Sequence, residues 1–108
     1  MEIVYGQGEY QEGAKHFSGR IVLSEHKLFL KDELGQDFPQ TYIPLEKIEK
    51  IKQKANVCEV YVRPAITVRY QAVFKGEKSF IDSLIKELVQ RRRLKKQFLR
   101  REWIEEIS

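Results

Sequence analysis

Two runs of alternating apolar and polar residues meet in the segment 57-VCEVYVRPAITVRYQAVF-74. In the first run Cys58, Val60 and Val62 share one side, and Pro64-Ala65 then forms a short connection. In the second run the positions that share a side are Ile66, Val68, Tyr70, Ala72 and Phe74. A period of two is typical of a strand with one buried face. We therefore predict an antiparallel hairpin here.

The residues upstream of this hairpin also predict β structure. Residues 20–24 and 27–31 form a second candidate hairpin with its turn at Ser24-Glu25-His26. Further along the chain we expect a strand entry, a short turn over residues 44–47 and another strand over residues 48–53. Glycines and prolines punctuate the whole segment, as expected where turns interrupt strands. Residues 1–76 are therefore predicted to be a β body.

The hydrophobic period changes after Glu77. The apolar positions now follow helical spacing: Phe80, Ile81, Leu84, Ile85, Leu88 and Val89. Such spacing predicts an amphipathic helix that packs one face on the β body. No Gly or Pro occurs from there to Ser108, so the helix is expected to continue to about residue 107. About 30 helical residues would span roughly 45 Å, so the helix either bends back or reaches a partner.

Two short motifs carry a family resemblance. The run 12-EGAKHFSGRIVLSEHKLFL-30 resembles the opening of GRAM and bacterial PH-like domains, which show a small-residue turn, a glycine and then spaced Leu and Phe residues. The run 43-IPLEKIEKI-51 resembles their Ile-Pro-Leu-x-x-Ile-x-x-Ile element. The resemblance extends over about residues 10–90, including the order of a β body and then a helix.

The resemblance implies an α+β fold in which a bent antiparallel barrel, or a pair of sheets, is plugged at one end by the helix from about Ser79 to Gln90, which is the first part of the long C-terminal amphipathic helix expected above. Residues 1–90 would form this PH-like domain, with the β body at 1–76 and the capping helix at 77–90, and residues 91–108 would extend the helix. PH domains that bind phosphoinositides carry a basic pattern on their first strands. Lys15 and Arg20 are the candidate headgroup contacts here, but Val22 stands where a second basic residue would fall.

Residues 91–101 hold seven basic residues and no acid, and Glu102, Glu105 and Glu106 come next. The candidate contact residues are Arg91, Arg92, Arg93, Lys95, Lys96, Phe98, Arg100, Arg101 and Trp103. Four interpretations of this basic segment compete: a solvated helix face, a contact with an anionic membrane surface, a contact with nucleic acid, and a contact with a protein partner. We expect a protein partner or a second copy of the chain, with peripheral membrane binding as the alternative. Nucleic acid is disfavoured by the acids and by a net charge of only +4.

Catalysis is not expected from these residues. The lone Cys58 lies on an apolar strand face without an activating base, and His16 and His26 lack a cysteine partner at metal-ligand spacing. Gly6-Gln7-Gly8 does not lead into a helix, so it predicts turns and no phosphate cradle. We expect a non-catalytic binding or scaffold module without metal, cofactor or small-molecule substrate. One cysteine and no signal-like N-terminus favour the cytoplasm, in solution or peripheral to the membrane.

Overall fold

The chain forms one antiparallel sheet of nine strands and a fifteen-residue α-helix in the computed structural model, which describes residues 1–97 and 99–105. The strands are β1 (Ile3–Glu12), β2 (Lys15–Leu23), β3 (Lys27–Lys31), β4 (Ile43–Pro44), β5 (Ile48–Lys54), β6 (Val57–Ala65), β7 (Val68–Gly76), β8 (Lys95–Lys96) and β9 (Glu102–Ile104). The helix α1 (Lys78–Arg92) and two 3-10 turns, η1 (Pro39–Thr41) and η2 (Leu45–Lys47), complete the described elements. The predicted α+β class is confirmed.

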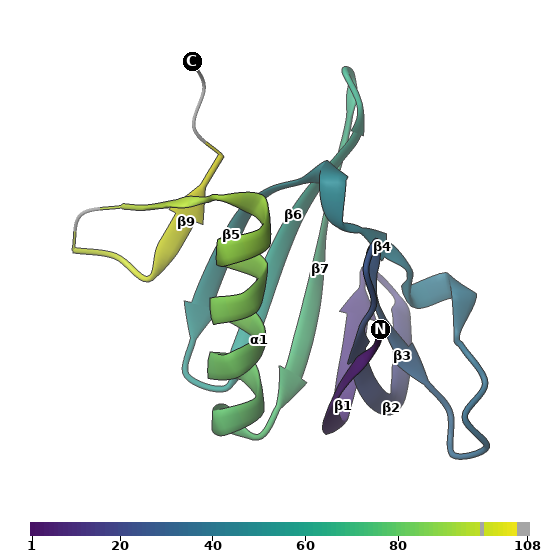
Figure 1. The fold of residues 1–108 in the computed structure, drawn as a ribbon. Helices are drawn as coiled ribbons and strands as arrows, with labels where there is room; N and C mark the ends of the chain where they lie inside the picture. The colour runs from purple at the N-terminus through teal and green to yellow at the C-terminus, as the bar shows by residue number, and fades with distance from the viewer. Residues whose placement is uncertain (98, 106–108) are drawn as a thin grey trace.

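The strand order is β4-β3-β2-β1-β7-β6-β5-β9-β8. Strand β1 joins the two parts of the sheet, because it pairs with β2 along its length and with β7 over Gly8–Gln11. Of the predicted barrel or pair of sheets, neither describes the strand order: the nine strands form one open sheet with β4 and β8 at its opposite ends, so no barrel closes. Figure 1 shows α1 in front of the part that contains β5, β6 and β7, with β1, β2 and β3 to one side.

The predicted hairpin at residues 57–74 is present as β6 and β7. Its core end shows the expected alternation, with Cys58, Val60 and Phe74 fully buried. Its turn lies at Ile66-Thr67 rather than at Pro64-Ala65, because Ala65 pairs with Val68 after a register shift. The alternation predicts Ile66 and Val68 on the buried face, but they are 80% and 48% exposed. The alternating sequence pattern continues beyond the edge of the core, where no second layer of the described structure covers this end of the hairpin.

The other predicted β elements are also found. Strands β2 and β3 form a hairpin around Ser24, whose backbone amide donates to the carbonyl of Lys27 at 2.9 Å. The Ser24 hydroxyl donates to the same carbonyl at 3.2 Å. The predicted turn over residues 44–47 is η2, which leads directly into β5. This path carries the chain across the end of α1 and thereby positions one wall of the candidate site.

Helix α1 packs on the sheet through the predicted apolar face, where Ile81, Leu84, Ile85 and Leu88 are buried. At its N-terminal end the Phe80 ring lies directly over Gly6, where a register shift interrupts the β1–β2 pairing. A Cβ atom at Gly6 would overlap that ring, and the backbone φ of +135° is one that side chains rarely adopt. Gly6 therefore allows the helix to approach β1 closely. The turn predicted at Gly6-Gln7-Gly8 is wrong, because these residues lie within β1.

The helix ends at Arg92, so the predicted continuation to about residue 107 is wrong over the described residues 93–97 and 99–105, and of the helical extension predicted for residues 91–108 only Arg91 and Arg92 are helical there. Arg93 adopts a left-handed backbone conformation with φ 53°. The amide of Leu94 donates to the carbonyl of Val89 at 3.0 Å, and the Leu94 side chain is buried. A backward hydrogen bond with an apolar contact is a common helix stop. The chain thus turns back toward its own sheet. This is one of the two alternatives expected for a helix too long for its domain, the other being contact with a partner.

After this turn the chain adds strands β8 and β9 to the edge of β5. Lys50, Ile51 and Lys52 of β5 face Ile104, Trp103 and Glu102 of β9. Pairing with β5 satisfies backbone groups that a solvent-exposed edge would leave unpaired. Burial of Trp103 adds apolar surface to the core. We call residues 94–97 and 99–105 the C-terminal hairpin; Phe98 and residues 106–108 lie outside the described residues.

Candidate functional site

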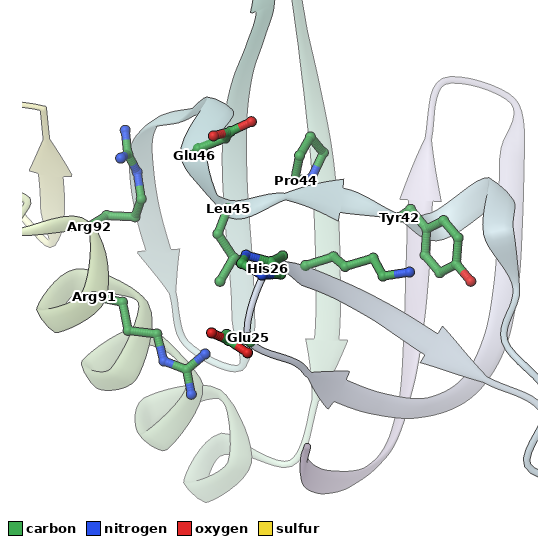
Figure 2. Close-up of a pocket in the computed structure, with 9 residues that line it drawn as sticks. Glu25, His26, Tyr42, Pro44, Leu45, Glu46, Arg91 and Arg92 are labelled. Atoms are coloured by element: carbon green, nitrogen blue, oxygen red, sulfur yellow. The ribbon is translucent and has the colours of Figure 1, made fainter. Parts of the chain in front are cut away.

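A pocket of about 560 Å³ opens where the β2–β3 turn, η2 and the C-terminal end of α1 meet. Its size is within the range of sites that hold small ligands or single side chains. Figure 2 shows the side chains that line it: Glu25, His26, Lys27, Tyr42, Pro44, Leu45, Glu46, Arg91 and Arg92. We call this the turn–helix pocket. It brings together three chain segments that are distant in the sequence.

The helix contributes two of the predicted contact residues, Arg91 and Arg92. Arg91 Nε donates to the Glu87 carboxylate at 3.0 Å, and its Nη1 donates to the carbonyl of Ser24 at 2.7 Å. Arg92 donates to the carbonyl of Ile48 through Nε at 3.2 Å and Nη2 at 3.0 Å. Each guanidinium is therefore held in place by the protein. Because a guanidinium carries five N–H donors, N–H groups remain on both for a ligand.

The opposite wall comes from the β2–β3 turn and the segment before η2. The amide of Leu45 donates to the carbonyl of His26 at 2.9 Å, which ties the two segments together. Lys27 Nζ lies 3.8 Å from the centre of the Tyr42 ring. The Tyr42 hydroxyl donates to Asp37 Oδ2 at 2.7 Å, and this hydrogen bond raises the pKa of Tyr42 above its usual value. The wall is thus a fixed aromatic and cationic surface.

The charges in the turn–helix pocket are mixed. Arg91, Arg92 and Lys27 are cationic, whereas Glu25 and Glu46 are anionic and exposed. Leu45 and Pro44 provide apolar surface between them. A polyanion would be attracted by the first set and repelled by the second. A ligand that carries both charges beside an apolar group matches all three surfaces.

Sequence reasoning identifies only the two arginines of this pocket. It assigns Glu25 and His26 to a solvated turn, and it does not single out Tyr42 and Glu46. The 24–26 turn and the 43–47 segment are about twenty residues apart, and the pairing of β3 with β4 and the hydrogen bond from Leu45 to His26 bring them together. The available signal is the Ile-Pro-Leu motif at 43–45, which marks the segment that faces the turn.

The remaining predicted contact residues lie elsewhere. Lys95 and Lys96 form β8, and Arg93, Lys95, Lys96 and Arg100 are exposed. Arg101 donates to Gln53 Oε1 through Nε at 3.1 Å and Nη2 at 2.8 Å, and its guanidinium lies 5.4 Å from the Trp103 ring centre. Trp103 is only 9% exposed, so the expectation that it anchors on a membrane or a partner is corrected: it packs in the core. Phe98 lies outside the described residues.

Lys15 and Arg20 do not form a joint headgroup site. Both belong to β2, in whose own chain no register shift falls, so an odd separation of five residues directs them to opposite faces. Lys15 lies at the turn after β1, and Arg20 faces Lys31 of β3 across the sheet. Five residues of extended strand separate Lys15 from Arg20 by roughly 17 Å. The structure therefore provides no paired basic contact at these two positions.

Glu102 holds the C-terminal hairpin against β5. It is only 7% exposed, and its carboxylate lies 3.2 Å from Lys50 Nζ, 3.1 Å from Lys52 Nζ and 3.5 Å from Arg100 Nη1. The hydrogen bond from Lys52 and the adjacent Lys50 lower the pKa of Glu102 below its ordinary value of 4.5. The ionised carboxylate is thus the form that the folded hairpin favours.

We expect docking of the hairpin to weaken in acid. A carboxyl with a lowered folded pKa contributes stability above its ordinary pKa of 4.5, and that contribution is lost as the pH falls through the folded value. The fluorescence of Trp103, the single tryptophan, should report release during titration from about pH 6 to about pH 3. In Glu102→Gln this acid transition should shrink, and an unchanged transition would contradict the role of Glu102.

The other residues considered for chemistry have structural environments. Cys58 is fully buried, and burial raises the pKa of its thiol to about 12, so the thiolate needed for nucleophilic attack is not formed at neutral pH. His16 lies 3.1 Å from the Glu9 carboxylate on the exposed surface of β1 and β2. In residues 1–97 and 99–105, no three His, Cys, Asp or Glu side chains are grouped so that they could hold a metal ion.

Comparison with protein-family models, curated proteins and solved structures finds no match to this chain. Within the part of the chain that the structure describes, no helix is both long and apolar enough to cross a membrane. The function is therefore inferred from the geometry of the turn–helix pocket and from the order of the elements around it.

Proposed function

We propose that the chain is a non-catalytic PH-like binding module. The order of its elements supports this: seven antiparallel strands precede a helix that packs across β5, β6 and β7. The motifs at 12–30 and 43–51, which carry the resemblance, lie on the β2–β3 hairpin with the turn before it and on the path from β4 into β5. The single cysteine is unpaired and buried, which fits a reducing compartment such as the cytoplasm.

The ligand that we propose is a segment of a protein partner, bound in the turn–helix pocket. The observation that carries this proposal is the mixed charge of the pocket: Arg91 and Arg92 on one side, Glu25 and Glu46 on the other, with apolar Leu45 between them. A peptide segment offers acidic, basic and apolar side chains within a few residues. A phosphoinositide headgroup offers negative charge without a cationic group and would meet two repelling carboxylates.

The basic segment no longer supports the alternative of membrane binding through a helix. That alternative requires a continuous helix with an exposed Trp103, but the chain forms strands after Leu94 and buries Trp103. Arg101 donates two hydrogen bonds to the side-chain oxygen of Gln53. We therefore retain the protein partner as the proposed ligand, with contact through the pocket instead of a helical extension.

Short peptides can test the pocket directly. We would titrate four synthetic sets (acidic, basic, neutral, and mixed acidic and basic around a leucine) and monitor amide chemical shifts. We expect the mixed set to bind best and to shift residues around His26 and Tyr42. Arg91→Gln and Glu46→Gln should each weaken the mixed peptides about tenfold, since each removes one charged contact. Lys86→Gln removes a charge from an exposed position of the same helix and should leave binding unchanged.

The direction of the Glu46→Gln effect separates two ligand classes. If the natural ligand is polyanionic, removal of Glu46 should strengthen binding of acidic peptides and of inorganic phosphate, and the mixed peptides should show no advantage. That result would overturn the proposed partner. Thermal melting of each variant gives the fraction folded. This control is needed because Arg91 also donates to the carbonyl of Ser24, so weaker binding must be distinguished from unfolding.

A further inference from the structure

Specific backbone and side-chain contacts attach the C-terminal hairpin to β5 and α1. Beyond its three paired residues, the amide of Gln53 donates to the carbonyl of Arg101 at 2.9 Å, and the amide of Glu105 donates to the carbonyl of Glu49 at 2.9 Å. Arg101 donates to the Gln53 side chain, which in turn donates to Asp82 of α1 at 2.5 Å. The surface that receives the hairpin is therefore built by β5 and α1.

The connection between this hairpin and the rest of the chain is short and strained. Only Arg93 and Leu94 separate the end of α1 from β8. Arg93 has φ 53°, a left-handed conformation in which a residue with a Cβ atom is disfavoured relative to glycine. A short hinge under strain is a typical starting point for the exchange of an element between identical chains.

The sequence around the hinge also supports a second backbone path. No glycine or proline interrupts residues 77–108, and apolar residues continue after Arg92. If Arg93 took a right-handed conformation, α1 would lengthen and carry the next residues away from their own β5. This path removes the left-handed conformation of Arg93, but it exposes the β5 edge and the apolar surface beneath Trp103. Both surfaces then need another segment that makes the same contacts.

We propose that the β5 edge is an interaction surface for a second copy of this chain, which docks its own C-terminal hairpin there in exchange. The complementarity selects this occupant. On this edge a carboxylate lies opposite Lys52 and also reaches Lys50, a large aromatic residue lies opposite Ile51, and a cation reaches Gln53. Glu102, Trp103 and Arg101 supply this set in register, and a second copy carries the same set. This inference does not depend on the turn–helix pocket.

Two substitutions at the hinge test the exchange in opposite directions. Arg93→Gly removes the left-handed strain and should favour the monomer, whereas Arg93→Ile increases it and should favour the dimer. Because a dimer contains two hinges, we expect the dimer dissociation constants of the two variants to differ by about thirtyfold or more. Light scattering after refolding over a range of protein concentrations measures this. No dimer in Arg93→Ile at any concentration would overturn the proposal.

A mixed cross-link identifies the surface involved. Lys50 and Ile104 face each other, so cysteines at these positions are within reach of a disulfide. Lys50→Cys and Ile104→Cys are introduced into separate proteins, which carry Arg93→Ile and are refolded together. We expect a disulfide-linked dimer that contains one chain of each kind. The doubly substituted protein that retains Arg93 should close the disulfide within one chain, which shows that the pair can react. Dimers that form without the mixed cross-link would place the contact elsewhere and overturn the exchange.

Discussion

Replacing Leu84 by Asp is expected to unfold the protein. Leu84 is fully buried on the face of α1 that packs against the sheet. A carboxylate at this position would lose its hydration without gaining a partner, and an uncompensated buried charge costs several kcal/mol. Small domains have only about 5–15 kcal/mol of stability in total. Circular dichroism should show loss of the cooperative thermal transition.

The neighbouring residue provides a matched control for this experiment. Ser83 lies one position earlier on the same helix and is exposed, so Ser83→Asp introduces the same carboxylate into solvent. We expect its melting temperature to change little, since exposed substitutions usually alter stability by less than about 0.5 kcal/mol. If Leu84→Asp melted like the unaltered protein, the packing face assigned to α1 would be wrong.

Replacing Trp103 by Ala is expected to lower the free energy of unfolding by about 3 kcal/mol. Trp103 is 9% exposed and contributes to the hydrophobic core. Truncation of a buried tryptophan removes its transfer free energy and leaves a cavity. It also removes the ring on which the Arg101 guanidinium lies. Urea denaturation monitored by circular dichroism measures the change, because the substitution removes the tryptophan signal.

The role of Trp103 can be separated from that of an exposed anchor. Leu99 belongs to the same hairpin and is 87% exposed. Leu99→Ala should leave the free energy of unfolding within about 0.5 kcal/mol of its original value. If Trp103→Ala were equally silent, the tryptophan would be a surface anchor, as the basic sequence around it suggests, and the hairpin would not be part of the core.

The turn–helix pocket can be predicted only in part. Arg91 and Arg92 are identifiable because basic residues cluster in the sequence at the end of α1. Their counterparts Glu25 and Glu46 cannot be assigned to the same site, because a site built from a turn, a 3-10 segment and a helix end has no sequence spacing of its own. The pairing of β3 with β4 defines it.

The sequence by itself determined the elements whose pattern is local. Alternation at Cys58, Val60 and Phe74 predicts strands that the structure contains, and the three-to-four spacing through Leu84 predicts the face that α1 buries. These patterns are reliable because one buried face imposes the period of the backbone on the side chains.

Only the tertiary structure decided where α1 ends and how the chain continues beyond it. Residues 94–104 carry the charges and apolar residues of a helix, and no Gly or Pro separates them from the start of α1. The chain nevertheless leaves the helix at Arg93, because the edge of β5 offers backbone hydrogen bonds and the core offers burial to Leu94 and Trp103. Contacts with residues some fifty positions earlier therefore outweigh the local preference, as long-range packing often outweighs propensity. The same competition at Arg93 underlies the exchange that we propose.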